Sequence, residues 1–171
     1  MHELSDRFAR LFEQGGPLLW AILALSTLMW ILIIERYWFL RRQAPALRRE
    51  LVAAWQTNRQ VTAELRSRML RSFTDRMRGE VSRHLLTIRT LTAILPMLGL
   101  LGTVTGMITV FQVITVFGTG NTRGMAAGIS EALVTTLAGL ATALPGLYLA
   151  SRLEQRARSV TERLSQELTA E

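Results

Sequence analysis

The chain has 171 residues, of which 49% are hydrophobic and 19% charged, and its formal net charge is +7. The apolar residues are concentrated in long blocks, which indicates a small integral membrane protein with one membrane domain. The absence of cysteine excludes disulfides and thiolate metal sites. The positive charge would suggest a nucleic-acid partner only if it lay away from the membrane segments, so its position along the chain decides its meaning.

The chain begins with a polar lead of mixed charge, residues 1–16. Its apolar residues fall at a helical spacing and predict a short amphipathic helix at the membrane interface: Leu4, Phe8, Leu11 and Phe12. Pro17 is accepted in a first helical turn and opens a charge-free run, residues 17–34, which predicts the first transmembrane helix. Because Glu35-Arg36 follow it without a small-residue cleavage site, we interpret the run as an uncleaved span and not as a signal peptide.

Most of the basic charge lies in residues 35–90, a predicted cytoplasmic loop with thirteen arginines and five acidic residues. The lead has two arginines and the predicted turn at residues 118–124 has only Arg123. The positive-inside rule therefore places the N-terminus in the periplasm and, after three spans, the C-terminus in the cytoplasm. No helix-turn-helix, zinc or RNA-recognition pattern accompanies the arginines, so we expect no nucleic-acid partner. Contact with anionic lipid headgroups is an accessory alternative, and His84 lacks the neighbouring ligands of a metal site.

The cytoplasmic segments are predicted to be helices with one apolar face. In the loop, apolar residues recur in steps of four and predict a single uninterrupted helix that continues into the second span: Val61, Leu65, Met69, Phe73, Met77, Val81 and Leu85. The tail at residues 151–171 repeats the pattern and extends the third span: Leu153, Ala157, Val160, Leu164 and Leu168. We expect the two extensions to pack together, joined by a shorter helix that Leu47, Leu51 and Trp55 indicate after Pro45.

Residues 91–117 and 125–150 are the second and third predicted transmembrane helices, folded back on each other. The second helix has no ionisable residue, whereas the third contains Glu131. A carboxylate at mid-membrane costs very roughly 2.5–3.5 kcal/mol, so its presence favours a function. The predicted fold class is an all-α membrane protein with three transmembrane helices, in which spans two and three extend into the cytoplasm as long helices.

Small residues predict that spans two and three pack tightly. Gly102 and Gly106 form a GxxxG pattern next to Gly99, and this pattern lets a second helix approach closely. The third span carries a matching stripe at steps of four and three: Gly128, Ala132, Thr135, Gly139, Thr142 and Gly146. The glycine-rich segment lacks the lysine and the strand-to-helix setting of a phosphate loop, and other catalytic motifs are missing. We therefore expect no enzyme activity, no metal and no cofactor.

Hydroxyl residues accompany Glu131 on both spans: Thr103, Thr105 and Thr109 on the second, and Thr135, Thr136 and Thr142 on the third. Each threonine alone is consistent with a hydroxyl bonded to a carbonyl of its own helix. Their clustering with a carboxylate favours a hydrated cavity for an ion. Because three spans enclose little space, several copies or a partner helix must complete that cavity. The alternative is a packing glutamate bonded to a threonine.

Two sequence signatures resemble those of the ExbB/TolQ/MotA proton-channel family. They are GLLGTVTGM (99–107), preceded by Pro96, and GISEALVTTLAGLATALPG (128–146), and Glu35-Arg36 fits the same family. The resemblance covers essentially the whole chain, and the order and separation of the two signatures are specific. Three spans with an outward N-terminus are more similar to ExbB and TolQ than to the four-span MotA. The short lead and short loop are most similar to compact ExbB-type proteins.

The resemblance implies a homopentamer in the bacterial inner membrane, in which spans two and three line a passage for the single membrane helices of an ExbD- or TolR-like dimer. Proton flow would drive motion that a TonB-like protein passes to outer-membrane receptors. The resemblance also implies that Thr103 and Thr136 line the pore, that Glu131 is the family's intramembrane glutamate, and that Pro96 and Pro145 are its helix prolines. The proton-carrying aspartate would belong to the partner.

Two departures from the family pattern leave the ion and the partner open. Thr105 stands where many relatives have tryptophan, and Ala127 stands where many have proline. The alternatives are a TonB-type transport motor, a TolQ-like motor for envelope maintenance, and a structural membrane scaffold without an ion role. In a motor, which would use protons or sodium, Glu131 either exchanges protons or stays ionised and sets the cation preference of the cavity.

Overall fold

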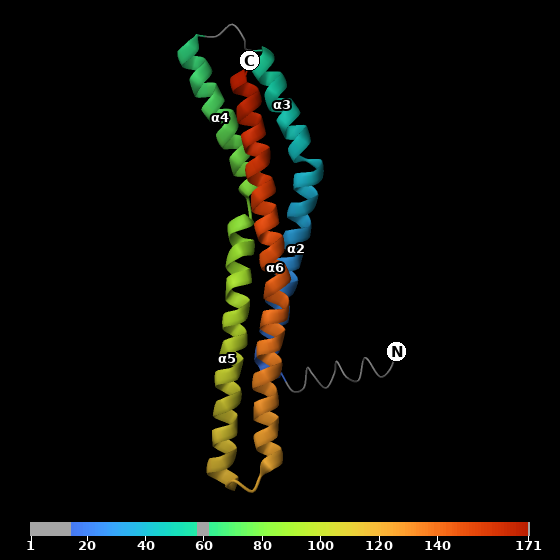
Figure 1. Cartoon of the computed structure of the whole chain (residues 1–171), viewed down its shortest axis with the longest axis vertical. Coiled ribbons are helices and arrows are strands. Elements are labelled where there is room, and N and C mark those ends of the chain that lie inside the picture. The colour runs from blue at the N-terminus through green and yellow to red at the C-terminus, as the bar shows by residue number, and fades with distance from the viewer. Residues whose placement is uncertain (1–14, 58–61, 171) are drawn as a thin grey trace, which may run out of the picture. The chain divides into compact units, whose positions relative to one another are not determined.

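The computed structural model describes residues 15–57 and 62–170, and every regular element among them is an α-helix. In chain order the helices are α2 (Gly16–Arg42), α3 (Ala44–Thr57), α4 (Ala63–Ser82), α5 (Leu85–Phe117) and α6 (Thr122–Ala170) (Figure 1). The predicted all-α fold is confirmed. The amphipathic helix expected in the polar lead falls mainly on residues 1–14, outside the described residues.

Three helices are long and apolar enough to cross a membrane, and they are the three predicted spans. Their best 18-residue windows have mean hydropathies of 2.3 in α2, 1.9 in residues 64–117, which include α5, and 1.6 in α6. Each helix runs beyond its apolar part, because polar residues with good helix propensity continue the same backbone geometry. The protein is therefore a multi-pass membrane protein whose third span continues as a long helix to residue 170.

The described residues fall into two compact units. The apolar unit comprises residues 15–30 and 89–147, and the charged unit comprises residues 31–57, 62–88 and 148–170. In the apolar unit α5 and α6 run antiparallel and a short turn joins them (Figure 1). Its buried side chains come from all three spans: Leu19, Ile22, Met29, Leu95, Val110 and Ala132.

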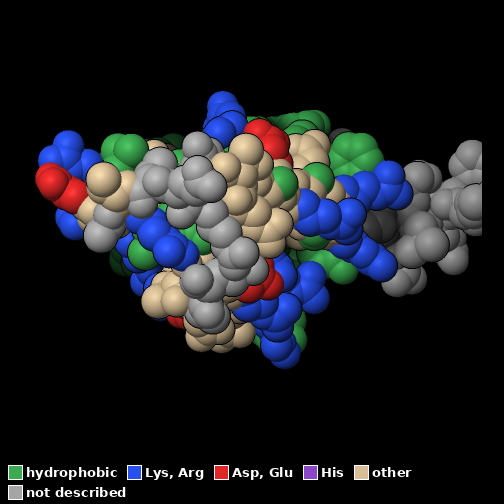
Figure 2. Space-filling view, turned by 90° about the horizontal axis from the view of Figure 1, so that it is seen from above, with side chains coloured by type: hydrophobic (Ala, Val, Ile, Leu, Met, Phe, Trp, Pro, Cys, Tyr) green, Lys and Arg blue, Asp and Glu red, His purple; other side chains and the backbone are tan. Residues whose placement is uncertain are grey.

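The core of the charged unit is built from the apolar rows predicted for the loop and the tail. Among its buried side chains are these from α3, α4 and α6: Leu51, Trp55, Met77, Val81, Leu153, Ala157, Leu164 and Leu168. At its outer end α4 is less buried, since Leu65 is 47% exposed. Figure 2 shows arginine side chains spread over this end of the protein with acidic side chains between them. One pair joins two helices, because Arg48 of α3 forms two hydrogen bonds with the Glu167 carboxylate of α6.

The prediction of one uninterrupted helix through residues 61–117 is wrong, because Arg83 and His84 separate α4 from α5. Arg83 is extended, with φ −52° and ψ 137°, and His84 has a φ of 62°. That left-handed conformation costs a non-glycine residue about 1–3 kcal/mol. The break still preserves the apolar row, because Val81 before it and Leu85 after it are both buried.

Arg36 hydrogen-bonds to a backbone carbonyl at the end of α4, beside this break. Its side chain is 1% exposed and donates a hydrogen bond to the carbonyl oxygen of Glu80. That carbonyl lies in the last turn of α4, where carbonyls have no partner within the helix. The guanidinium also lies over the ring of Phe39, 4.5 Å from its centroid. Among the described residues, Nε of Arg36 finds no hydrogen-bond acceptor.

Candidate functional site

Glycines bring the backbones of α5 and α6 into direct contact in the apolar unit. A Cβ atom on Gly139 would lie 2.7 Å from the carbonyl oxygen of Leu95 and 3.1 Å from the Cα of Gly99. A Cβ atom on Gly106 would lie 2.7 Å from the carbonyl oxygen of Gly128. Backbone atoms at this separation leave no room for a larger residue, which is the packing that small residues allow between membrane helices.

Two adjacent threonines of α6 lie on this contact. Thr135 is fully buried, and its hydroxyl donates to carbonyl oxygens of its own helix 2.9 and 3.1 Å away. Its Oγ1 occupies the space that a side chain at Gly102 would need. The Thr136 hydroxyl lies 3.0 Å from the Ala132 carbonyl and 3.1 Å from the Gly99 carbonyl of α5, so it reaches across the contact.

Four other threonines of α5 and α6 also donate their hydroxyl hydrogens to their own helix. The donors and their carbonyl acceptors are Thr103 and Leu100 (2.6 Å), Thr105 and Gly102 (3.1 Å), Thr109 and Thr105 (3.2 Å), and Thr142 and Ala138 (2.8 Å). A hydroxyl has one hydrogen to donate and two lone pairs. These four oxygens, all of them at least partly exposed, can therefore accept hydrogen bonds or approach a cation, and they offer no donor to an anion.

The Glu131 carboxylate lies against the beginning of α2. The residue is half-buried, and a Cβ atom on Gly16 would overlap Oε1 and lie 3.3 Å from Cδ of the carboxylate. Gly16 has a φ of 60° and is the first residue of α2, so the carboxylate is at the positive end of that helix dipole. Glu131 thus has a contact within one subunit that does not involve an ion.

The structure does not bring Glu131 and Thr136 onto one face of α6. Residues five positions apart are rotated by about 140° around a helix, and Thr136 faces α5 whereas Glu131 faces the start of α2. Thr135 points closer to the direction of Glu131 but is fully buried. Within this chain the Glu131 carboxylate and the Thr136 hydroxyl are therefore separate polar positions.

Two prolines lie inside the spans, Pro96 in α5 and Pro145 in α6, and neither ends its helix. Each removes one backbone hydrogen bond from its helix.

Two features were not predicted from the sequence: the contact of Gly16 with the carboxylate of Glu131, and the burial of Arg36. The Gly-Gly-Pro sequence indicates where α2 begins, but it contains no signal for the helix that lies beside that point.

Comparison with known proteins finds one family over most of the chain. The model of the MotA/TolQ/ExbB proton channel family matches residues 41–166. A biopolymer transport protein ExbB of Aquifex aeolicus is 32% identical over 96 residues, which are 55% of this chain and 65% of that protein. The putative biopolymer transport protein ExbB-like 1 of Synechocystis is 43% identical over 65 residues, 36% of this chain and 26% of that protein. A putative biopolymer transport protein ExbB homolog of Methanothermobacter thermautotrophicus is 40% identical over 82 residues, which are 48% of this chain and 28% of that protein. Each match thus spans less than two thirds of the relative.

Proposed function

The chain belongs to the MotA/TolQ/ExbB proton channel family, and on that premise we propose that it is the channel-forming subunit of an ExbB-type inner-membrane motor. In this proposal the motor uses the proton-motive force to energise TonB-dependent transport across the outer membrane. One observation supports it above the others. Glu131 is a half-buried carboxylate within residues 91–150, whose only other charged residue, Arg123, lies at the start of α6.

The proposed pathway runs along the accessible threonine oxygens of α5 and α6. Thr103 and Thr136 offer oxygens whose hydrogens are already bound to backbone carbonyls, so they suit water molecules that carry a proton. Glu131 lies on another side of α6, where it holds or releases a proton once a further chain completes the path. Thr135 was expected in the pathway as well, and since it is buried at the helix contact we assign it to the wall.

The proposal includes an assembly of several copies, a pentamer by family resemblance, around the single-span helices of an ExbD- or TolR-like partner. The N-terminus then lies in the periplasm and the C-terminus in the cytoplasm, because the arginines are concentrated in the loop and the tail. A TonB-like protein is the expected recipient of the motion, and no nucleic acid takes part.

A structural scaffold is the second candidate, and the contact between Glu131 and Gly16 favours it. A carboxylate at a helix N-terminus stabilises that helix by about 0.3–1 kcal/mol, or about 2 kcal/mol where it is partly buried. On this interpretation Glu131 fixes the start of α2 and carries no proton.

Proton flux into liposomes containing the full chain and its single-span partner separates the two candidates. We expect Glu131→Gln to lower the flux at least about tenfold, a loss typical of removing a positioned acid–base group, while the assembly keeps its size. Thr136→Val and Thr103→Val should lower it less. Thr115→Val is the matched control, because its hydroxyl also bonds to its own helix, at Phe111 (2.8 Å), on an exposed side of α5. Unchanged flux in the Glu131 variant would refute a role of Glu131 in proton conduction, and loss of the assembly would favour the scaffold.

A further inference from the structure

Helices α2 and α6 form an open pocket of about 350 Å³ in the charged unit. Six residues line it: Tyr37, Leu40, Arg41, Arg156, Ser159 and Val160. Leu40 is buried at its base, while Tyr37 is 42% exposed. The pocket therefore has an apolar floor and an accessible polar rim, and the polar rim determines what it binds.

The rim places the guanidinium groups of Arg41 and Arg156 in one pocket with Tyr37. Arg156 and Arg41 lower the pKa of the Tyr37 hydroxyl by hydrogen bonding and by their positive charge, and the Cζ of Arg156 lies 5.3 Å from the centroid of the Tyr37 ring. None of the described residues that line the pocket is acidic. Two positive charges held together without a carboxylate repel each other, and a bound anion with several oxygens relieves this repulsion. Guanidinium groups match the geometry of phosphate oxygens, which they bind through pairs of hydrogen bonds.

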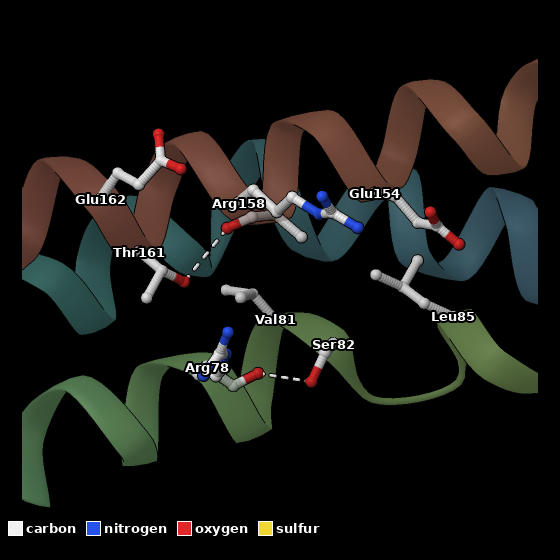
Figure 3. Close-up of a pocket in the computed structure, with 9 residues that line it drawn as sticks. Arg78, Val81, Ser82, Leu85, Glu154, Arg158, Thr161 and Glu162 are labelled. Atoms are coloured by element: carbon white, nitrogen blue, oxygen red, sulfur yellow. Dashed lines mark hydrogen bonds between the residues drawn. The ribbon is translucent and has the colours of Figure 1, made fainter.

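A second pocket on α6 shows that this charge pattern is specific to one face. It lies beside the break between α4 and α5 and has a volume of about 470 Å³. Figure 3 shows Arg78 and Arg158 in this pocket together with Glu154 and Glu162. Its charges therefore balance, whereas those of the Tyr37 pocket do not. Arg158 provides a matched control, because it is an exposed arginine on the same helix, two residues from Arg156.

The position of Tyr37 just after the charge-free run predicts that its pocket lies at the level of the lipid headgroups. Tyr37 is the third residue after the charge-free run 17–34. The next residue, Trp38, is 57% exposed and has Arg42 over its ring, with 5.3 Å between Cζ and the centroid. Exposed aromatic residues paired with arginines at the end of an apolar span are typical of the membrane–water interface.

We propose that Tyr37, Arg41 and Arg156 bind the phosphate of an anionic phospholipid. The two guanidinium groups hold the phosphate oxygens, the tyrosine hydroxyl donates one further hydrogen bond, and the acyl chains lie along the exposed apolar side of α2. Basic pockets between membrane helices bind lipid headgroups in this way. The site does not depend on proton conduction. Only the assignment of the bound lipid to the cytoplasmic leaflet depends on the orientation proposed above.

Lipid titration of the purified, delipidated full-length assembly in detergent tests the site by native mass spectrometry. The probes are phosphatidylglycerol, phosphatidylcholine with the same acyl chains, and inorganic phosphate. Of the three probes, we expect only phosphatidylglycerol to bind tightly. Its affinity should fall at least about tenfold when Arg41 and Arg156 are both replaced by glutamine. Arg158→Gln should change the affinity less than about twofold, and Tyr37→Phe should lower it by a few fold because it removes one hydrogen bond.

Each other outcome contradicts the proposal. Equal binding of the two lipids would show no selection for an anionic headgroup. Competition by inorganic phosphate at lipid concentrations would assign the pocket to a soluble anion. An equal loss in Arg158→Gln would show an effect of net charge alone. Because the Arg41 and Arg156 side chains are exposed, their variants should fold, and replacement of both by lysine keeps the charge and should retain an intermediate affinity. Proton flux is not measured in this experiment, so its result is independent of the conduction test.

Discussion

Replacing Gly139 with alanine should weaken the contact between α5 and α6. The new Cβ atom would lie 2.7 Å from the Leu95 carbonyl oxygen, where an ordinary contact is 3.4 Å or more, so the helices must separate by about 0.7 Å. Overpacking of this kind costs about 1–3 kcal/mol, and the better helix propensity of alanine returns about 1 kcal/mol. The expected net loss in the free energy of unfolding is therefore about 1 kcal/mol and at most about 2 kcal/mol.

The same substitution at Gly79 is the control. A Cβ atom there has nothing within 4 Å, so alanine should raise stability by about 0.5–1 kcal/mol through backbone entropy. The assay is unfolding of the purified full chain in mild detergent by added sodium dodecyl sulfate, followed by far-ultraviolet circular dichroism. If Gly139→Ala is as stable as the unsubstituted protein while Gly79→Ala is stabilised, the two backbones do not touch at Gly139 and the packing argument fails.

Three further predictions concern the charged unit, and the same unfolding assay checks each. His84→Gly should raise stability by about 1 kcal/mol, because glycine adopts a φ of 62° without strain, and a loss would show that the imidazole is needed. Arg36→Ala should cost about 2–4 kcal/mol by leaving a cavity and an unbonded Glu80 carbonyl, and Arg36→Met should cost less because it keeps the volume. Equal costs would mean that packing of the side chain is irrelevant. Glu167→Gln should cost under about 1 kcal/mol, because the pair with Arg48 is partly exposed, and the cost should vanish in high salt; a salt-independent cost would contradict an ionic origin.

Most helices were predictable because the apolar periodicity of the sequence survives in the packed structure. Met77 and Leu164, one from each predicted row, are fully buried. The break between α4 and α5 was not predictable from the same signal. Val81 and Leu85 are four residues apart and both buried, so a kinked and a straight helix give the same pattern. His84 adopts the left-handed conformation without the glycine that usually marks it.

The close contact between α5 and α6 could be predicted, but the surroundings of Glu131 could be predicted only in part. The glycines were informative because backbone contact between helices requires them locally. The contact of Glu131 with Gly16 joins residues 115 positions apart in the sequence, and it depends on where α2 lies, which no local pattern records. The separation of Glu131 from Thr136 was already implied by their spacing, because five residues do not return to the same side of a helix.

The threonine oxygens of the hairpin impose an orientation on any water molecule that reaches them. Because the hydroxyl hydrogens of Thr103 and Thr136 are bound to backbone carbonyls, such a water must give a hydrogen to the threonine and turn its own oxygen outward. In the proposed pathway, a row of water molecules held in this way presents lone pairs to an arriving charge, which favours a hydronium or sodium ion over chloride. Discrimination by sign thus begins with neutral side chains and does not require the ionised form of the carboxylate.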